Sequence, residues 1–223
     1  MLLRKSVVGR SVEHRPLRAM RTWPPCRGKS MILLLGGFHG DEPKGVRVCE
    51  RFAELLSGDA PGAGNANWII VPLVNPDGFE RRNRRNANGI DLNRNFPTQN
   101  WVRGNKRSRM FGGEKPASEP ETRAIVRLVE RCRPTVIVTL HSIGRKRFCN
   151  NFDGPARRLA KRMSDYNRYP VTTSIGYPTP GSFGTWAGIE KKIPTITLEL
   201  PSLHSNKRCW TDNHKALLSL ALR

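Results

Sequence analysis

The sequence lacks long hydrophobic segments. No apolar run approaches the roughly 20 residues that a membrane-spanning helix requires. The segment Met1–Arg10 is basic, but it has neither the apolar stretch nor the small-residue cleavage site of a secretory signal peptide. We therefore expect a soluble protein that stays in the cytoplasm.

A cysteine framework is also missing. The chain has five cysteines, an odd number, and no C-x-x-C spacing. These features argue against a set of disulfides and against a zinc site built from cysteine. Cys49 and Cys132 fall within helical patterns, where a buried thiol acts as a small apolar side chain.

Acidic and aromatic residues are scarce. Asp and Glu number 18 against 39 Lys and Arg, which gives a net charge of +21, and aromatic residues make up 7% of the chain. A nucleic-acid partner would explain the charge, but no nucleic-acid-binding motif accompanies it and few aromatic side chains are available for base stacking. We favour a solvated basic surface, which would also suit a small acidic peptide as the partner.

Strand and helix patterns alternate along the chain. A length of 223 residues suits one α/β domain, which we expect to span residues 1–223 and to include a short extended segment at 1–30. The domain should contain a mixed, mostly parallel twisted sheet with helices on both faces. Apolar runs predict strands at Met31–Leu35, Trp68–Val74, Thr135–Leu140 and Ile193–Leu200, and helical spacing predicts helices at Gly45–Leu56, Pro155–Asn167 and Asp212–Leu222.

Two further segments stand out between these elements. Ser118–Glu121 has the pattern of a capping box and predicts the start of another helix, which gives Glu121 a structural rather than a catalytic role. Phe79–Gly113 has little periodicity and is rich in Arg, Asn and Gly. A loop of this length inside a compact domain is usually functional.

Candidate metal ligands follow the predicted strands. His39 and Glu42 come after the first strand with Gly40 between them, so that both side chains can face one point. His141 ends another strand, and the carboxyl ends of parallel strands are where such sheets collect ligands. Two imidazoles and one carboxylate form a zinc set with an open fourth position. Asp41 is the competing carboxylate, but the longer side chain of Glu42 suits the site better.

A spare carboxylate and several arginines complete the candidate site. Glu199 interrupts an apolar strand, which is costly unless the side chain lines a cleft, and it is the candidate general base. Glu190 is the alternative, although it resembles a solvated turn residue beside two lysines. Arg84 and Arg94 are suited to a developing oxyanion and to a substrate carboxylate, and Asn93 lies beside the second.

The order and spacing of these motifs resemble the zinc carboxypeptidases of the carboxypeptidase A superfamily. The resemblance runs from about Gly9 to the C-terminus and rests on His39–Glu42, Asn75–Gly78, Arg84–Pro97, His141-Ser142 and Thr197–Glu199. It implies one zinc ion on His39, Glu42 and His141, with Glu199 as general base and acid. It also implies that Arg84 polarises the scissile carbonyl, that Asn93 and Arg94 hold the carboxylate of the departing residue, and that Tyr177 closes over the substrate.

Within that superfamily, Glu114–Thr122 and Gly176–Trp186 look most like the murein peptide amidases. This resemblance implies hydrolysis of a γ-D-glutamyl–diaminopimelate bond. The sequence departs from it after His141, where Ser142-Ile143 replaces Asp-Pro and a basic stretch, Arg145–Arg147, follows. That stretch is either a solvated turn or a rim that meets a second substrate carboxylate.

Two other functions are compatible with parts of the sequence. Zinc-dependent N-acyl amino acid hydrolases of the succinylglutamate desuccinylase and aspartoacylase type also begin with a His-Gly-x-Glu motif. A basic protein without catalytic activity would account for the charge. Asn75–Gly78 and Tyr177 favour the peptidase over the first alternative, and the presence of both Glu199 and Arg84 argues against the second.

Overall fold

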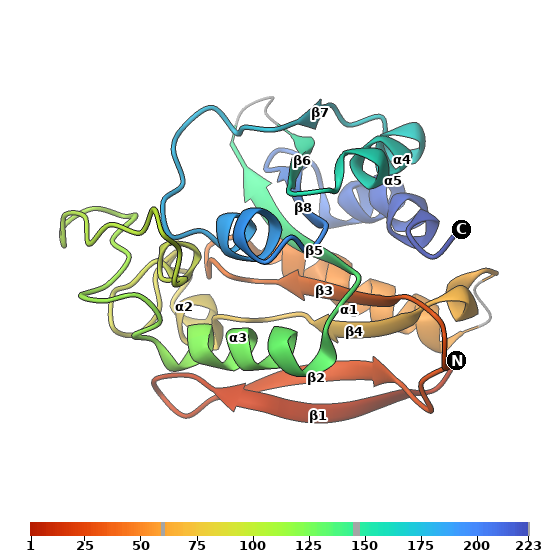
Figure 1. Cartoon of the computed structure of the whole chain (residues 1–223), viewed down its shortest axis with the longest axis horizontal. Coiled ribbons are helices and arrows are strands. Elements are labelled where there is room, and N and C mark those ends of the chain that lie inside the picture. Colours follow the sequence, from red (N-terminus) through yellow and green to blue (C-terminus); the bar gives the residue numbers. More distant parts are fainter. Residues whose placement is uncertain (59–60, 145–147, 223) are drawn as a thin grey trace.

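The computed structural model describes residues 1–58, 61–144 and 148–222, and a twisted eight-stranded sheet forms their centre (Figure 1). The strands lie in the order β1-β2-β4-β3-β5-β8-β6-β7. Their bounds are β1 Leu3–Arg10, β2 Pro16–Thr22, β3 Met31–Gly36, β4 Asn67–Val71, β5 Val136–Ile143, β6 Cys149–Asp153, β7 Val171–Thr172 and β8 Thr195–Pro201.

The middle of the sheet is parallel and the flanking strands are mostly antiparallel. β4, β3, β5 and β8 run in the same direction, whereas β1, β2 and β6 pair antiparallel with their inner neighbours. β3 and β4 are almost wholly buried, as expected for central strands covered on both faces. The predicted fold class, a mixed and mostly parallel sheet, is confirmed.

Helices cover both faces of this sheet. α1 Pro43–Ser57, α4 Arg157–Asn167 and α5 Asn206–Ser219 share one apolar cluster with one face. α3 Pro120–Cys132 and a π-helical segment, Thr185–Glu190, pack against the other face. α2 Pro76–Glu80 is a short helix after β4. None of the helices within the described ranges is long and apolar enough to cross a membrane.

Several predicted boundaries differ from the structure. The first 30 residues contain a complete antiparallel hairpin, β1–β2, which joins the sheet through β4. The strand predicted to reach Val74 ends at Val71, and the last helix begins at Asn206 rather than Asp212. Neither β6 nor β7 was predicted, because β6 has the sequence Cys-Asn-Asn-Phe-Asp and lacks an apolar run.

The capping box predicted at Ser118–Glu121 is wrong. Glu119 is the N-cap residue of α3, and its side chain forms no capping hydrogen bond. Ser118 instead donates to the Glu119 carboxylate, 2.7 Å away. Glu121 is fully buried and accepts hydrogen bonds from the Val12 backbone amide and from Asn86. Glu121 therefore contacts the N-terminal hairpin rather than capping the helix end.

Candidate active site

The carboxyl ends of β3, β5 and β8 surround a cavity of about 340 Å³. The turn after β3 depends on glycine. Gly37 has a positive φ of 63°, and a Cβ atom at Gly40 would lie 2.0 Å from the carbonyl carbon of Gly78. This close approach places His39 and Glu42 at the cavity wall.

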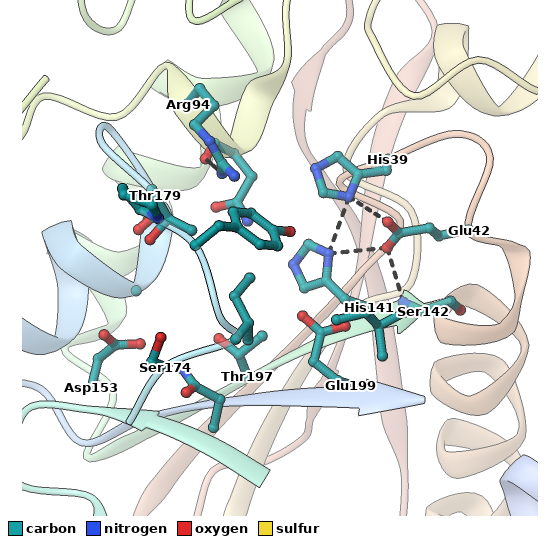
Figure 2. A pocket seen from close by; sticks show the side chains of 18 of the residues that line it. His39, Glu42, Arg94, His141, Ser142, Asp153, Ser174, Thr179, Thr197 and Glu199 are labelled. Carbon is teal, nitrogen blue, oxygen red and sulfur yellow. Dashed lines mark hydrogen bonds and ion pairs between the residues drawn. The ribbon is translucent and has the colours of Figure 1, made fainter. Parts of the chain in front are cut away.

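His39, Glu42 and His141 converge at one end of the cavity (Figure 2). The Nδ1 atoms of the two imidazoles are 3.2 Å apart, and Glu42 places its oxygens 2.7 Å from His39 Nδ1 and 3.1 Å from His141 Nδ1. Ligand atoms in a tetrahedral zinc site with bonds of about 2.0–2.1 Å lie roughly 3.3 Å apart. The three side chains therefore have a spacing that fits zinc.

Asp91 links His39 to Arg84, and sequence analysis assigned it no role. Its carboxylate lies 3.1 Å from His39 Nε2 and accepts a hydrogen bond of 2.9 Å from Arg84 Nε. A carboxylate on Nε2 keeps the proton on that nitrogen and turns the Nδ1 lone pair towards a metal. Asp91 lies inside the Arg84–Pro97 motif, and that position was the one available signal.

The electrostatic field at this end of the cavity favours a cation. Burial alone would lower the pKa of His39, but the carboxylates of Glu42 and Asp91 outweigh it and raise the pKa to about 9. Burial lowers the pKa of His141. The donor atoms of His39, Glu42 and His141 face one point, and the Asp91 carboxylate lies behind His39. This buried group therefore matches the charge of a divalent metal as well as its geometry.

Glu199 on β8 is the register partner of His141 on the neighbouring strand β5, and it lines the same cavity. Only 5% of its surface is exposed. No described residue donates a hydrogen bond to its carboxylate. Burial, with a further contribution from Glu42, raises the pKa of Glu199 to about 8. A carboxyl group with a pKa near neutrality can both accept and release a proton.

Arg84, Asn93 and Arg94 line the cavity from the long loop. Besides its bond to Asp91, Arg84 places Nη1 3.5 Å from Glu42. Asn93 accepts a hydrogen bond from the Phe183 backbone amide through its side-chain oxygen, which leaves its amide nitrogen free to donate. Burial lowers the pKa of Arg94, and its guanidinium donates a hydrogen bond of 2.6 Å to the Asn93 backbone carbonyl at the cavity wall. A guanidinium has five N–H donors, so one such bond leaves others for an anion.

At the far end of the cavity lies Asp153, a residue that sequence analysis did not identify. Figure 2 shows it beside Ser174, away from His39 and Glu42. No described residue forms a hydrogen bond or ion pair with its carboxylate, and burial raises its pKa to about 6. Room for it depends on Gly184, because a Cβ atom there would lie 2.4 Å from Asp153 Oδ2. An unpaired carboxylate inside a cavity is suited to bind a cation.

Comparison with known proteins agrees with this geometry. The zinc carboxypeptidase family matches residues 1–207. The chain belongs to this family. It is therefore a zinc metallopeptidase, a hydrolase that acts on peptide bonds.

Several relatives of this zinc carboxypeptidase are known. Murein peptide amidase A of Escherichia coli K12 is 34% identical over 194 residues, which cover 82% of this chain and 76% of that protein. The crystal structure of a murein-tripeptide amidase from Escherichia coli O157 matches with a TM-score of 0.75 and 30% identity over 97% of this chain and 91% of that one. Thrombin-activatable fibrinolysis inhibitor, at 21% identity, shares the fold with a TM-score of 0.82 over 99% of this chain and 68% of that chain.

Other residues singled out in the sequence lie elsewhere in this zinc carboxypeptidase. Asp41, the competing ligand, faces away from the metal group and pairs with Arg109 at 3.0 Å. Glu190, the alternative base, accepts a hydrogen bond from the Gln99 backbone amide. Tyr177 lines the cavity and is 39% exposed. The basic stretch 145–147 lies outside the described residues.

Proposed function

We propose that this zinc peptidase hydrolyses the amide bond before a C-terminal residue with a free carboxylate, and that this bond joins γ-D-glutamate to diaminopimelate in murein peptides. The proposed substrate is inferred from Asp153. The side chain of diaminopimelate ends in an amino acid group, whose ammonium would meet the unpaired Asp153 carboxylate at the far end of the cavity. The murein peptide amidases among the relatives support the same substrate class.

One zinc ion would be held by His39, Glu42 and His141, whose ligand atoms all lie within 4.8 Å of one another. When bound, zinc would polarise the scissile carbonyl and lower the pKa of the attacking water. Asp91 keeps the His39 ring oriented for this purpose.

Proton transfer falls to Glu199. Its carboxylate accepts the proton of the attacking water and returns it to the nitrogen of the departing amine. Arg84, held by Asp91 and close to Glu42, faces the carbonyl oxygen as negative charge develops there. Both roles use interactions that strengthen as the transition state forms.

Substrate binding is divided between the two ends of the departing residue. Asn93 and Arg94 hold its α-carboxylate, and Asp153 binds the cationic group of its side chain. Tyr177 closes over the bound residue from the exposed side of the cavity. Release of a C-terminal lysine is the second candidate function, because Asp153 would also bind a single side-chain ammonium.

Mass-spectrometric product analysis tests both candidates. The zinc-loaded protein would be given L-Ala-γ-D-Glu-diaminopimelate and two analogues in which lysine or leucine replaces diaminopimelate. We expect the fastest release for diaminopimelate and the slowest for leucine. Equal release of lysine would favour the second candidate, and preferred release of leucine would contradict the proposed role of Asp153.

A further inference from the structure

A second, smaller pocket adjoins the catalytic cavity at Arg84. Its volume is about 280 Å³, and its lining residues are Asp41, Arg82, Asn83, Arg84, Arg85 and Arg109. Arg84 is the one residue that lines both hollows. The four arginines outnumber the single carboxylate, so that the pocket is strongly basic.

Two of the four arginines in this pocket have carboxylate partners: Arg84 pairs with Asp91, and Arg109 pairs with Asp41. The other two differ from the arginines nearby. Arg81, one residue earlier, pairs with Glu13, and Arg103 pairs with Glu114. Arg82 and Arg85, by contrast, form no ion pair with any described residue. Asp41 is already engaged with Arg109 at 3.0 Å. The pocket therefore presents at least two guanidinium groups whose donors are free for an anion.

The position of the pocket relative to the scissile bond follows from the proposed function, on which this step rests. Arg94 and Asp153, which hold the departing residue, line the main cavity but not the smaller pocket. Arg84, which lines both the main cavity and the smaller pocket, faces the scissile carbonyl. A substrate that extends past Arg84 on its acyl side therefore places its next functional groups near Arg82 and Arg85.

We propose that this arginine pocket is a binding site for a carboxylate on the acyl side of the scissile bond. A γ-linked glutamyl residue keeps its α-carboxylate free, next to the nitrogen that continues the peptide. An α-linked residue has no carboxylate at that point. The pocket thus selects γ-glutamyl over ordinary peptide linkages, and it does so through Arg82 and Arg85, which take no part in the chemistry.

A matched pair of substrates isolates this contact. L-Ala-γ-D-Glu-diaminopimelate is compared with L-Ala-4-aminobutyryl-diaminopimelate, which has the same backbone and lacks only the acyl-side carboxylate. We expect the wild-type protein to prefer the first in kcat/KM by roughly tenfold, since a charge-assisted hydrogen bond at a partly exposed site has about that effect. The preference should shrink at high salt, because the screening length for exposed charges falls from about 8 Å at physiological ionic strength to about 3 Å at 1 M.

The Arg82→Ala/Arg85→Ala double variant should lose the preference and keep the wild-type rate on the 4-aminobutyryl peptide. Arg127→Ala/Arg131→Ala is the matched control, because it removes two exposed charges from α3 in a groove that shares no residue with the catalytic cavity. This control should retain the preference. An equal loss in both double variants would mean that net charge, not the pocket, attracts the substrate.

The outcome separates the pocket from the proposed function. Hydrolysis of both peptides at equal rates by the wild-type protein would overturn the arginine pocket and leave the peptidase assignment intact. Hydrolysis of neither would contradict the murein substrate. In that event, calorimetric titration of the wild-type protein and the Arg82→Ala/Arg85→Ala variant with the acyl-side dipeptide L-Ala-D-Glu decides the pocket separately, and equal affinities would reject it.

Discussion

Replacing Asp153 with asparagine should have opposite effects on stability and on substrate choice. The isolated carboxylate is costly to keep ionised in the cavity, since burial raises its pKa from an ordinary 3.8 to about 6. Asparagine has nearly the same shape and carries no charge. The substitution should therefore stabilise the free protein and remove its means of binding a cationic side chain.

The stability change can be worked out from the pKa. Between the two pKa values the folded protein binds more protons than the unfolded chain, so that stability falls as pH rises from about 4 to 6. The cost of ionised Asp153 amounts to about 3 kcal/mol at pH 8 and about 0.5 kcal/mol at pH 4. The first figure is an upper limit for the gain in free energy of unfolding, and it corresponds to roughly 6–12 °C in Tm for a chain of this size.

Urea unfolding of the metal-free forms at pH 4 and pH 8 measures this gain. Asp165→Asn is the control, since it removes the same charge from an exposed position on α4. Activity on peptides ending in diaminopimelate should fall about tenfold to a hundredfold in Asp153→Asn, with little change for leucine. For the wild type, the preference for a cationic residue should appear as pH rises through 6. An Asp153→Asn protein no more stable than wild type at pH 8, or one that keeps its preference, would refute the reasoning.

Three further predictions concern the metal end of the cavity. Glu199→Gln should keep zinc binding, measured by metal analysis, and lose about 10²–10⁴-fold in kcat, because an amide cannot accept the proton of water; unchanged kcat would remove Glu199 from the mechanism. Asp91→Ala should weaken zinc affinity about 10–100-fold in a competition assay with a chelator, since His39 loses its orienting carboxylate. Arg84→Ala should lower mainly kcat, whereas Arg94→Ala should raise mainly KM; the reverse pattern in steady-state kinetics would exchange their roles.

The metal group and the centre of the sheet were predictable because their signals are local. A glycine turn after an apolar strand places His39 and Glu42 three residues apart, and that spacing constrains both side chains without reference to the rest of the fold. β3 and β4 are continuous apolar runs because they are buried on both faces. The choice of Glu42 over Asp41 also followed from side-chain length.

β6 could not be predicted because two of its three buried residues are asparagines. Asn150 is fully buried, and its amide donates to Asn167 at 3.0 Å, so that side-chain hydrogen bonds replace the apolar contacts that a sequence pattern reveals. Asp153 ends this strand, and its place in the cavity was therefore hidden as well. In the sequence, nothing distinguishes the carboxylate of Asp153 from one that is exposed on the surface.

By itself, the sequence determined the chemistry that is available: two histidines, two glutamates and the arginines of one loop, in an order that specifies a zinc carboxypeptidase. Only the tertiary structure decided which further carboxylates lie at the same site. Asp91 meets His39 across 52 positions of chain, and Asp153 is brought to the same cavity by a strand that pairs with β8. Such long-range contacts depend on how the sheet is ordered, and strand order leaves no local periodicity in the sequence.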